Sequence, residues 1–283
     1  MQVEVLICTH NGARFLSEQL DSILGQSVPV DVIHIHDYAS IDSTRDIILD
    51  YNNRYVNIQY EIFENAMGPA ISFLSSMNLI KSNLGEKSIL FLADQDDIWL
   101  SDKVSRVISA FQSDVDFVFH NVEVVDSEGY SSSRREYFYG NFWNVNRDFK
   151  LPNLYFTNPI IGHTIALTGR LLNRLDLNAS QSIPMHDWHI AFQVLHAKSS
   201  FKYIAESLSL YRQHDSNLLG KKSIIRSIRR LKKASKTLGS YHAYLKEHYD
   251  VQIKYSDIVN IVPKSKLIYI IVLISYVKIF GYD

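Results

Sequence analysis

Residues 88–99 read Ser88-Ile-Leu-Phe-Leu-Ala-Asp-Gln-Asp-Asp-Ile-Trp99, an apolar run that ends abruptly in three carboxylates within four residues. The apolar part has the length and composition of a buried strand. Carboxylates at the end of a buried strand are costly unless a partner neutralises them, and a hard divalent cation does so. The alternative is a plain acidic turn in which Asp96 or Asp97 caps the next helix.

Strand and helix patterns alternate on both sides of this stretch. Apolar runs at 3–8, 30–36, 57–63 and 89–93 predict four strands, each followed by apolar residues at helical spacing. Four such units in about a hundred residues predict an α/β fold with a doubly wound, mostly parallel sheet. Further apolar runs predict strands at 117–125, around Gly162 within 158–168, and at 203–210.

Polar residues follow three of the four predicted strands. They are Thr9 to Asn11 after the first strand, Asp37 after the second, and Asp94 to Asp97 after the fourth. Ligands of doubly wound sheets bind outside the carboxyl ends of the strands, so we expect these clusters to meet on one rim. The chain has neither a glycine-rich dinucleotide fingerprint nor a P-loop. A nucleotide on this rim would therefore be held by a cation and carboxylates.

Composition places the chain among ordinary globular proteins. It has 283 residues, of which 46% are hydrophobic and 21% charged. The single cysteine, Cys8, excludes a disulfide framework and a cysteine metal cluster. The N-terminus enters a strand pattern directly, without the features of a signal peptide, so we expect a cytoplasmic protein.

Charge is distributed unevenly along the chain. Residues 216–246 hold nine Lys and Arg and no acid, whereas the whole chain carries a net charge of −1. We expect residues 1–215 to form the main domain and residues 216–283 a helical region whose basic face lies on an anionic membrane. The apolar stretch 267–280 is too short for a confident transmembrane span. The alternative is an appendage that packs on the main domain. We expect no nucleic-acid partner.

A long polar and aromatic segment at 126–158 has no clear periodicity. Long irregular segments inside a domain are commonly functional loops. Its aromatic residues are suited either to a platform for a sugar or to packing of the loop on the body.

Together, four motifs resemble those of family 2 glycosyltransferases with a GT-A fold, in the bacterial rhamnosyltransferase-like branch. The resemblance covers about residues 1 to 220, and its most specific part is the acidic motif with its tryptophan. The motifs are Val5–Gly12 with the helix pattern that follows, Asp37 with Ser40, Asp42 and Thr44, the run Phe91–Trp99, and Tyr211–His214. Two positions depart from the family pattern: the loop 37–42 lacks one acid and a glycine, and His163 stands where the branch often has cysteine.

The resemblance implies the roles of residues on the donor side. Asp94 and Asp96 are spaced so that a turn can aim both at one Mn²⁺ or Mg²⁺ ion, and His214 completes the coordination unless it is a plain loop histidine. Contacts to the nucleotide sugar are implied for Thr9, His10, Asn11, Arg14, Asp37, Asp94 and Gln95. For Arg14, a solvated position on its helix is the competing interpretation.

The resemblance also implies the residues on the acceptor side. Asp187 would be the catalytic base, with helix capping as its alternative. Residues expected in the pocket for the acceptor and the sugar are Trp99, His163, His186 and Trp188. Core packing is the competing role of both tryptophans.

The function implied is an inverting, metal-dependent glycosyl transfer. The donor would be dTDP-rhamnose or a UDP-hexose, and the acceptor a saccharide, lipid-linked, in the synthesis of a bacterial surface polysaccharide such as O-antigen or capsule. The enzyme would act at the inner face of the cell membrane. One alternative is a sugar-phosphate nucleotidyltransferase, although residues 9–12 are not the glycine- and basic-rich loop of that class. Another alternative is a non-catalytic sugar- or membrane-binding module. The retention of Asp94, Asp96 and Asp187 together argues against such a module.

Overall fold

The computed structural model describes residues 1–112, 114–131, 145, 149–156, 158–214 and 226–252, with only the backbone of 226–235. The strands are β1 Val3–Thr9, β2 Val32–Tyr38, β3 Ile58–Phe63, β4 Ile89–Ala93, β5 Ile98–Trp99, β6 Phe117–Val125, β7 Ala166–Thr168 and β8 Phe201–Arg212. The helices are α1 Leu16–Leu24, α2 Thr44–Arg54, α3 Pro69–Ile80, α4 Lys103–Ile108, α7 Leu151–Leu154, α8 Gly169–Leu172, α9 His186–His196 and α10 Arg226–Tyr249. Short 3-10 turns lie at Lys81–Asn83 and Gly162–Thr164.

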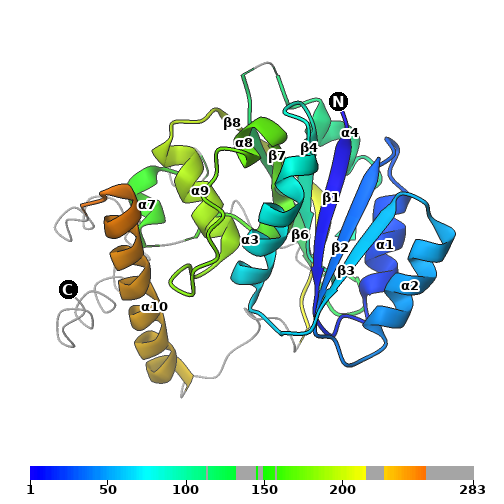
Figure 1. Cartoon of the computed structure of the whole chain (residues 1–283), viewed down its shortest axis with the longest axis horizontal. Helices are drawn as coiled ribbons and strands as arrows, with labels where there is room; N and C mark the ends of the chain where they lie inside the picture. The colour runs from blue at the N-terminus through cyan, green and yellow to red at the C-terminus, as the bar shows by residue number, and fades with distance from the viewer. Residues whose placement is uncertain (113, 132–144, 146–148, 157, 215–225, 253–283) are drawn as a thin grey trace.

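The strands form one eight-stranded sheet in the order β3-β2-β1-β4-β7-β6-β8-β5 (Figure 1). The half formed by β3, β2, β1 and β4 is parallel throughout. In the other half, β7 runs antiparallel to both β4 and β6, and the two-residue strand β5 runs antiparallel to β8. The predicted α/β fold with a mostly parallel sheet is therefore confirmed.

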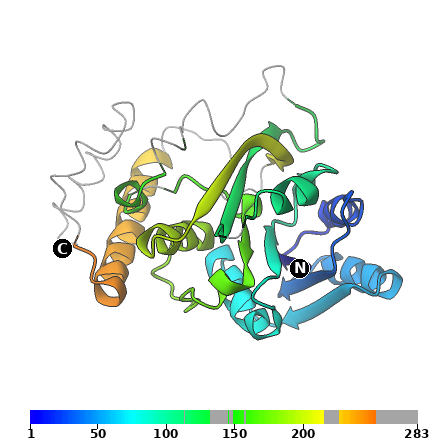
Figure 2. The same ribbon diagram turned by 90° about the horizontal axis from the view of Figure 1, so that it is seen from above.

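Two hydrophobic cores lie on opposite faces of this sheet, because alternate side chains of a strand point to opposite faces. On β1, Val5 and Ile7 belong to the core beneath α1, α2 and α4, and Leu6 belongs to the core shared with α3, α8, α9 and α10. Figure 2 shows these two groups of helices on either side of the strands. This two-sided cover explains why the parallel strands are near-continuous apolar runs.

The structure confirms the strands predicted before residue 126 and corrects two later assignments. The segment around Gly162 is a 3-10 turn, and the strand predicted there is limited to Ala166–Thr168. The strand predicted at 203–210 extends to Phe201–Arg212, because its last residues continue to pair with β6. Strand β5 has only two residues, which is too short for a strand pattern to be recognised in the sequence.

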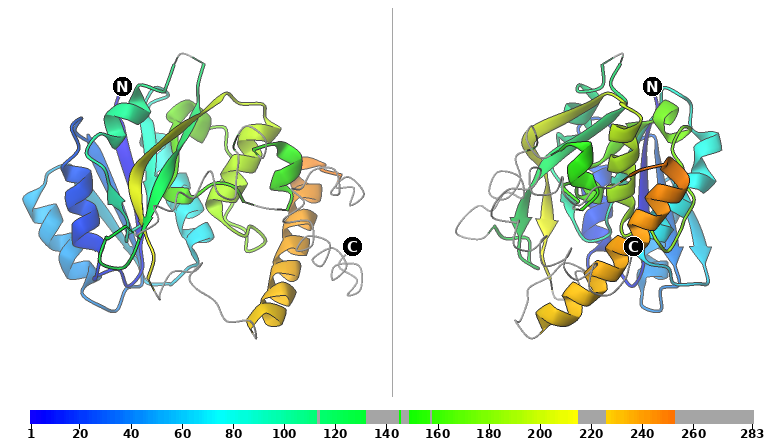
Figure 3. Two further views of the ribbon diagram at one scale, coloured as in Figure 1. Left: turned by 180° about the vertical axis from the view of Figure 1, so that it is seen from behind. Right: turned by 90° about the vertical axis from the view of Figure 1, so that its left-hand side faces the viewer.

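The helix α10 lies beside α7 and α9 (Figure 3). The basic residues 221 and 222, most of the aromatic segment 126–158, and the apolar stretch 267–280 lie outside the described residues. In the part of the chain that the structure describes, every helix is too short or too polar to cross a membrane.

Candidate active site

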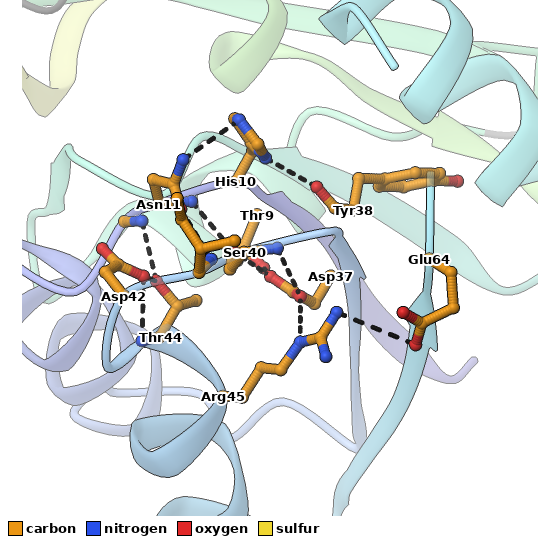
Figure 4. Close-up of polar contacts among 12 residues, drawn as sticks. Thr9, His10, Asn11, Asp37, Tyr38, Ser40, Asp42, Thr44, Arg45 and Glu64 are labelled. Atoms are coloured by element: carbon orange, nitrogen blue, oxygen red, sulfur yellow. Dashed lines mark hydrogen bonds and ion pairs between the residues drawn. The ribbon is translucent and has the colours of Figure 1, made fainter. Parts of the chain in front are cut away.

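Asp37 is the centre of the loops that follow β1 and β2 (Figure 4). Its carboxylate is fully buried and accepts hydrogen bonds from Thr9 Oγ1 at 2.8 Å and from the hydroxyl and backbone N–H of Ser40. Arg45 Nε lies 3.1 Å from the second carboxylate oxygen and pairs with it. Both oxygens therefore have partners within the protein. Asp37 fixes the shape of the rim, and its direct contact with a nucleotide stays a prediction.

The turn after β1 has a constrained backbone. Asn11 has φ of +50°, in the left-handed region that Asn tolerates better than most residues. Its Oδ1 accepts the backbone N–H of Ile41 at 2.9 Å, which joins this turn to the loop after β2. His10 Nδ1 lies 2.6 Å from the carbonyl oxygen of Tyr38 and makes a second link. The turns after β1 and β2 are thus one connected surface.

Gln95 joins the acidic turn to the same surface. The backbone N–H of His10 donates to Gln95 Oε1 at 2.9 Å, and Gln95 Nε2 donates to the carbonyl oxygen of His10 at 3.2 Å. A Cβ atom added at Gly12 would lie 2.2 Å from Gln95 Oε1, so only glycine fits there without movement. Gln95 was expected to contact the nucleotide sugar; the structure shows it holding the first loop.

Replacing Gly12 by Ala is expected to destabilise the protein by about 0.5–1.5 kcal/mol, because the new methyl group displaces Gln95 and breaks both amide bonds, which lie near solvent. Urea denaturation measures the loss. Gly68→Ala is the matched control, since a Cβ there has no neighbour within 4 Å. Equal stability of the two variants would show that Gln95 is not a structural link.

The acidic turn after β4 brings Asp96 against His214. Asp96 Oδ2 lies 2.8 Å from His214 Nε2, and the His214 ring packs on Phe15 with centroids 4.7 Å apart. Burial, followed by the charges of Asp97 and Asp94, raises the pKa of Asp96 to about 8. The raised pKa means that too little positive charge surrounds the Asp96 carboxyl group to stabilise its ionised form. A divalent cation between Asp96 and His214 would supply that charge, so these residues fit a metal ligand set.

Asp97 and His163 form a buried ion pair beneath this turn. Both side chains are fully buried, and His163 Nδ1 lies 2.7 Å from Asp97 Oδ2, although not in line for a hydrogen bond. Burial lowers the pKa of His163, but the charges of Asp97 and Asp94 outweigh it and raise the pKa to about 9. His163 is therefore an imidazolium at neutral pH. It supports the turn, and it does not line an open sugar pocket as the sequence had suggested.

Two metal ligand sets can be drawn from this cluster. Ligand atoms of Asp94, Asp97 and His163 lie within 4.8 Å of one another. A protonated imidazole has no lone pair for a metal, however, and Asp97 Oδ1 already accepts the backbone N–H of Arg212 at 3.0 Å. Asp96 and His214, which lie 2.8 Å apart, are therefore the better candidate ligands, with the Asp97 pair as their support, and the participation of Asp94 beside them stays a prediction.

Lys103 and Arg212 are two buried basic residues that sequence reasoning missed, and burial lowers the pKa of Lys103 well below its usual value. Lys103 Nζ donates to the carbonyl oxygen of His163 at 2.8 Å and lies 3.8 Å above the Trp99 ring. Arg212 donates through Nε to the carbonyl oxygen of Asp96 at 2.9 Å and through its other nitrogens to Ser127 and Glu18. Arg212 thus holds the acidic turn itself, and Lys103 holds the neighbouring turn at His163. The motif Tyr211–His214 was the available signal for Arg212.

Asp187 lies in the first turn of α9, near enough to the acidic turn to be affected by the charge of Asp94. It is 4% exposed, and its Oδ1 accepts Nδ2 of Asn158 at 2.9 Å and the backbone N–H of Trp188 at 2.7 Å. Burial raises its pKa to about 7, and the charge of Asp94 adds to the rise. The N-cap residue is Met185, so Asp187 is not the helix cap. A buried carboxyl with a pKa near neutrality is suited to proton transfer.

His186 precedes Asp187 and stacks on Phe73, with ring centroids 4.1 Å apart. Among the described residues neither of its ring nitrogens has a hydrogen-bond partner. A Cβ atom at Gly162 would lie 2.5 Å from His186 Nε2, which explains the glycine in this turn. A sugar contact of His186 stays a prediction.

Three further candidate residues, Trp99, Trp188 and Arg14, have the alternative roles that the sequence left open. The two tryptophans pack in the protein, and Arg14 lies at the surface. Trp99 is 3% exposed and packs in the core against Phe91, with ring centroids 5.6 Å apart. Trp188 Nε1 donates to the carbonyl oxygen of Leu154 at 2.5 Å, and its ring packs on α10. Arg14 is exposed and pairs with Glu128 at the surface.

Fold and site together define a class: α/β proteins that present an acidic, cation-attracting turn beside a polar loop, at the carboxyl ends of parallel strands. Residues 4–174 match the model of glycosyl transferase family 2, which is more than half of the chain. The chain belongs to glycosyl transferase family 2.

Curated relatives agree with this assignment. The chain is 28% identical over 227 residues to dTDP-rhamnosyl transferase RfbG of Shigella flexneri, covering 76% of this chain and 73% of that protein. It is 31% identical over 127 residues to an uncharacterized glycosyltransferase of Nostoc, covering 44% of this chain. The chain spans only 38% of the length of the Nostoc protein.

Solved structures share the GT-A fold. The Staphylococcus aureus protein TarS, in complex with UDP-GlcNAc, has a TM-score of 0.59 at 14% identity, covering 98% of this chain and 81% of that one. The mannosyltransferase PcManGT of Pyrobaculum calidifontis, in complex with GDP-Man and Mn²⁺, has a TM-score of 0.60 at 19% identity, covering 89% and 66%. At these identities the likeness establishes the fold alone.

Proposed function

We propose that this protein is an inverting, metal-dependent glycosyltransferase that moves a sugar from a nucleoside diphosphate onto a hydroxyl of a saccharide acceptor. The observation that carries the proposal is that the acidic residues of the site lie in two separate places with different surroundings. Asp96 faces His214 at 2.8 Å in a crowded turn, and Asp187 lies apart from them in a dry setting with a pKa of about 7. The turn with Asp96 and His214 suits the binding of a leaving diphosphate, and Asp187 suits the removal of a proton from an attacking hydroxyl.

Asp94, Asp96 and His214 would hold Mn²⁺ or Mg²⁺, with Asp97, Lys103 and Arg212 fixing the turn. When bound, the cation neutralises the charge that develops on the diphosphate. Thr9, His10 and Asn11 would meet the nucleotide largely through backbone groups of the surface that Asp37 and Gln95 hold together.

Asp187 would accept the proton of the acceptor hydroxyl as that oxygen attacks the anomeric carbon. The bond from this carbon to the diphosphate oxygen breaks on the opposite side, so the configuration inverts and the nucleoside diphosphate leaves. Asn158 and the backbone of Trp188 bind one carboxylate oxygen of Asp187 and fix its direction. The ionised form of Asp187 is the active one.

We also propose a donor sugar nucleotide and a class of acceptor. Likeness to a dTDP-rhamnosyl transferase over most of both chains supports dTDP-rhamnose, with a UDP-hexose as the rival. We propose a lipid-linked saccharide acceptor in surface polysaccharide synthesis, and contact of the basic region 216–246 with an anionic membrane. Family membership removes the nucleotidyltransferase alternative.

A thermal-shift screen of dTDP, UDP and GDP, each with and without Mn²⁺, tests the proposal. One nucleotide with Mn²⁺ is expected to raise Tm by about 5 °C or more at a hundredfold excess over its Kd. EDTA and Asp96→Asn are each expected to remove the part of the shift that depends on Mn²⁺. No shift with any nucleotide would contradict the proposal.

Donor turnover is expected to depend on pH through Asp187. Because the pKa of Asp187 is raised to about 7, activity falls as pH decreases through that value and reaches a plateau above it. The charge of Asp94 contributes to the raised pKa, so saturating Mn²⁺ should move the midpoint to lower pH. A pH profile of kcat/KM at two Mn²⁺ concentrations measures both effects. A midpoint that does not change with Mn²⁺ would mean that the titrating group is neither Asp187 nor Asp96, the other acid of the site whose pKa is raised.

A further inference from the structure

The helix α10 packs closely on the part of the molecule that carries Asp187. Its buried residues Tyr241 and Leu245 belong to the same hydrophobic core as Ile190 and Phe192 of α9. Tyr244 OH donates to Asp176 Oδ2 at 2.8 Å, which adds a polar contact to the loop before α9. Figure 3 shows α10 along α9 and α7, and in Figure 1 it lies on the side away from α1 and α2. The helix therefore belongs to the catalytic body.

Tyr241 packs against the residue that carries one of the hydrogen-bond donors to Asp187. The Tyr241 side chain is fully buried, and its ring centroid lies 5.5 Å from that of Trp188. The Trp188 indole is fixed on its other side by the bond from Nε1 to Leu154. The backbone N–H of Trp188 donates to Asp187 Oδ1. Loss of the Tyr241 contact would let the first turn of α9 shift, and the backbone donor of Trp188 would shift with it.

His242, the next residue on α10, supports the second donor. His242 Nε2 lies 2.6 Å from the carbonyl oxygen of Tyr155, and its ring packs edge-on against Phe156 with centroids 5.3 Å apart. Asn158 follows closely along the chain and donates through Nδ2 to the same oxygen of Asp187. Two adjacent residues of one helix thus pack against the segments that carry two donors to one carboxylate oxygen.

We propose that Tyr241 and His242 are positioning residues, and that α10 acts as a clamp which sets the direction of the Asp187 carboxylate. This proposal rests on the proposed role of Asp187 as the base. It makes part of the region after residue 215 necessary for the chemical step itself, in addition to any role in localisation. A misplacement of about 1 Å in a reacting group can cost about a hundredfold in rate.

Variants of the full-length chain test the clamp, with release of nucleoside diphosphate from dTDP-rhamnose, UDP-GlcNAc or GDP-mannose in Mn²⁺ as the assay. Tyr241→Leu and His242→Ala are expected to lower kcat about ten- to a hundredfold while the donor KM stays within about twofold. Tyr241→Phe keeps the ring and should retain nearly full kcat. Ile48→Ala, buried in the other core, is the control for lost stability.

The assay is run well below the melting temperature of every variant. Unchanged kcat in both Tyr241→Leu and His242→Ala, or an equal loss in Ile48→Ala, would overturn the clamp. If Tyr241→Leu does not fold, the result for His242→Ala decides alone, because His242 is 9% exposed whereas Tyr241 is fully buried. Asp187→Asn separates the two proposals: full turnover in that variant removes the base, whereas inactivity of Asp187→Asn with unaffected clamp variants removes only the clamp.

Discussion

Asp187→Asn is expected to lower turnover by about 10³-fold while binding of the nucleotide with Mn²⁺ stays intact. The amide has nearly the shape of the carboxylate and can still accept from Asn158 and Trp188, but it cannot take a proton at neutral pH. General base catalysis is worth about 10²–10⁴-fold, so its removal should dominate the kinetics. The measurements are kcat from donor turnover and the Kd of the nucleotide by calorimetry.

Asp116→Asn is the matched control for this experiment. Asp116 is also a buried carboxylate, 5% exposed, and it binds Thr168 and Arg170 near the start of β6. The pairing of β7 with β4 places Thr168 beside Ile89, at the end of the sheet opposite the acidic turn. Turnover should therefore be little changed. Similar losses in both variants would indicate general damage to the fold, and full activity of Asp187→Asn would exclude it as the base.

The rim of the site could be predicted because topology brings its parts together. Parallel strands buried on both faces are apolar runs with sharp polar ends, so the boundaries of β4 followed directly from Ile89–Ala93. Once the strands were parallel, Thr9 and Asp37 had to follow neighbouring strand ends, and they do bond to each other at 2.8 Å. The fold and the rim of the site could therefore be predicted from local patterns in a single sequence.

The support beneath the rim could not be predicted in the same way. A lysine in a helix pattern indicates a solvated face, because lysine is almost never fully buried unless paired, yet Lys103 is fully buried beneath the acidic turn. His163 meets Asp97 only because a short antiparallel strand inserts between β4 and β6. Such contacts join distant segments through side chains and leave no periodic signal. The same holds for Tyr241 and Trp188.

Asp97→Asn is expected to destabilise the cation-free protein by an amount that depends on pH. In the wild type the pKa of His163 is raised from 6.5 to about 9, chiefly by Asp97 acting against burial. A raised pKa contributes stability that is fully present below the unfolded value and is lost as pH rises through the folded value. The variant removes this contribution, which is on the order of 3 kcal/mol at about pH 6. With the charge of Asp97 gone, burial is opposed by Asp94 alone, so the pKa of His163 falls below its wild-type value.

Urea denaturation in EDTA at about pH 6 and about pH 9.5 measures this dependence, and the difference between wild type and Asp97→Asn should shrink strongly at the higher pH. His163→Gln should show little of the wild-type pH dependence, and adding Asp97→Asn to it should cost much less than in the wild type, because the partner charge is gone. A loss that is equal at both pH values would mean that the pair is uncharged. The support of the acidic turn would then come from Arg212 and Lys103 alone, and His163 would regain the lone pair that a metal ligand needs.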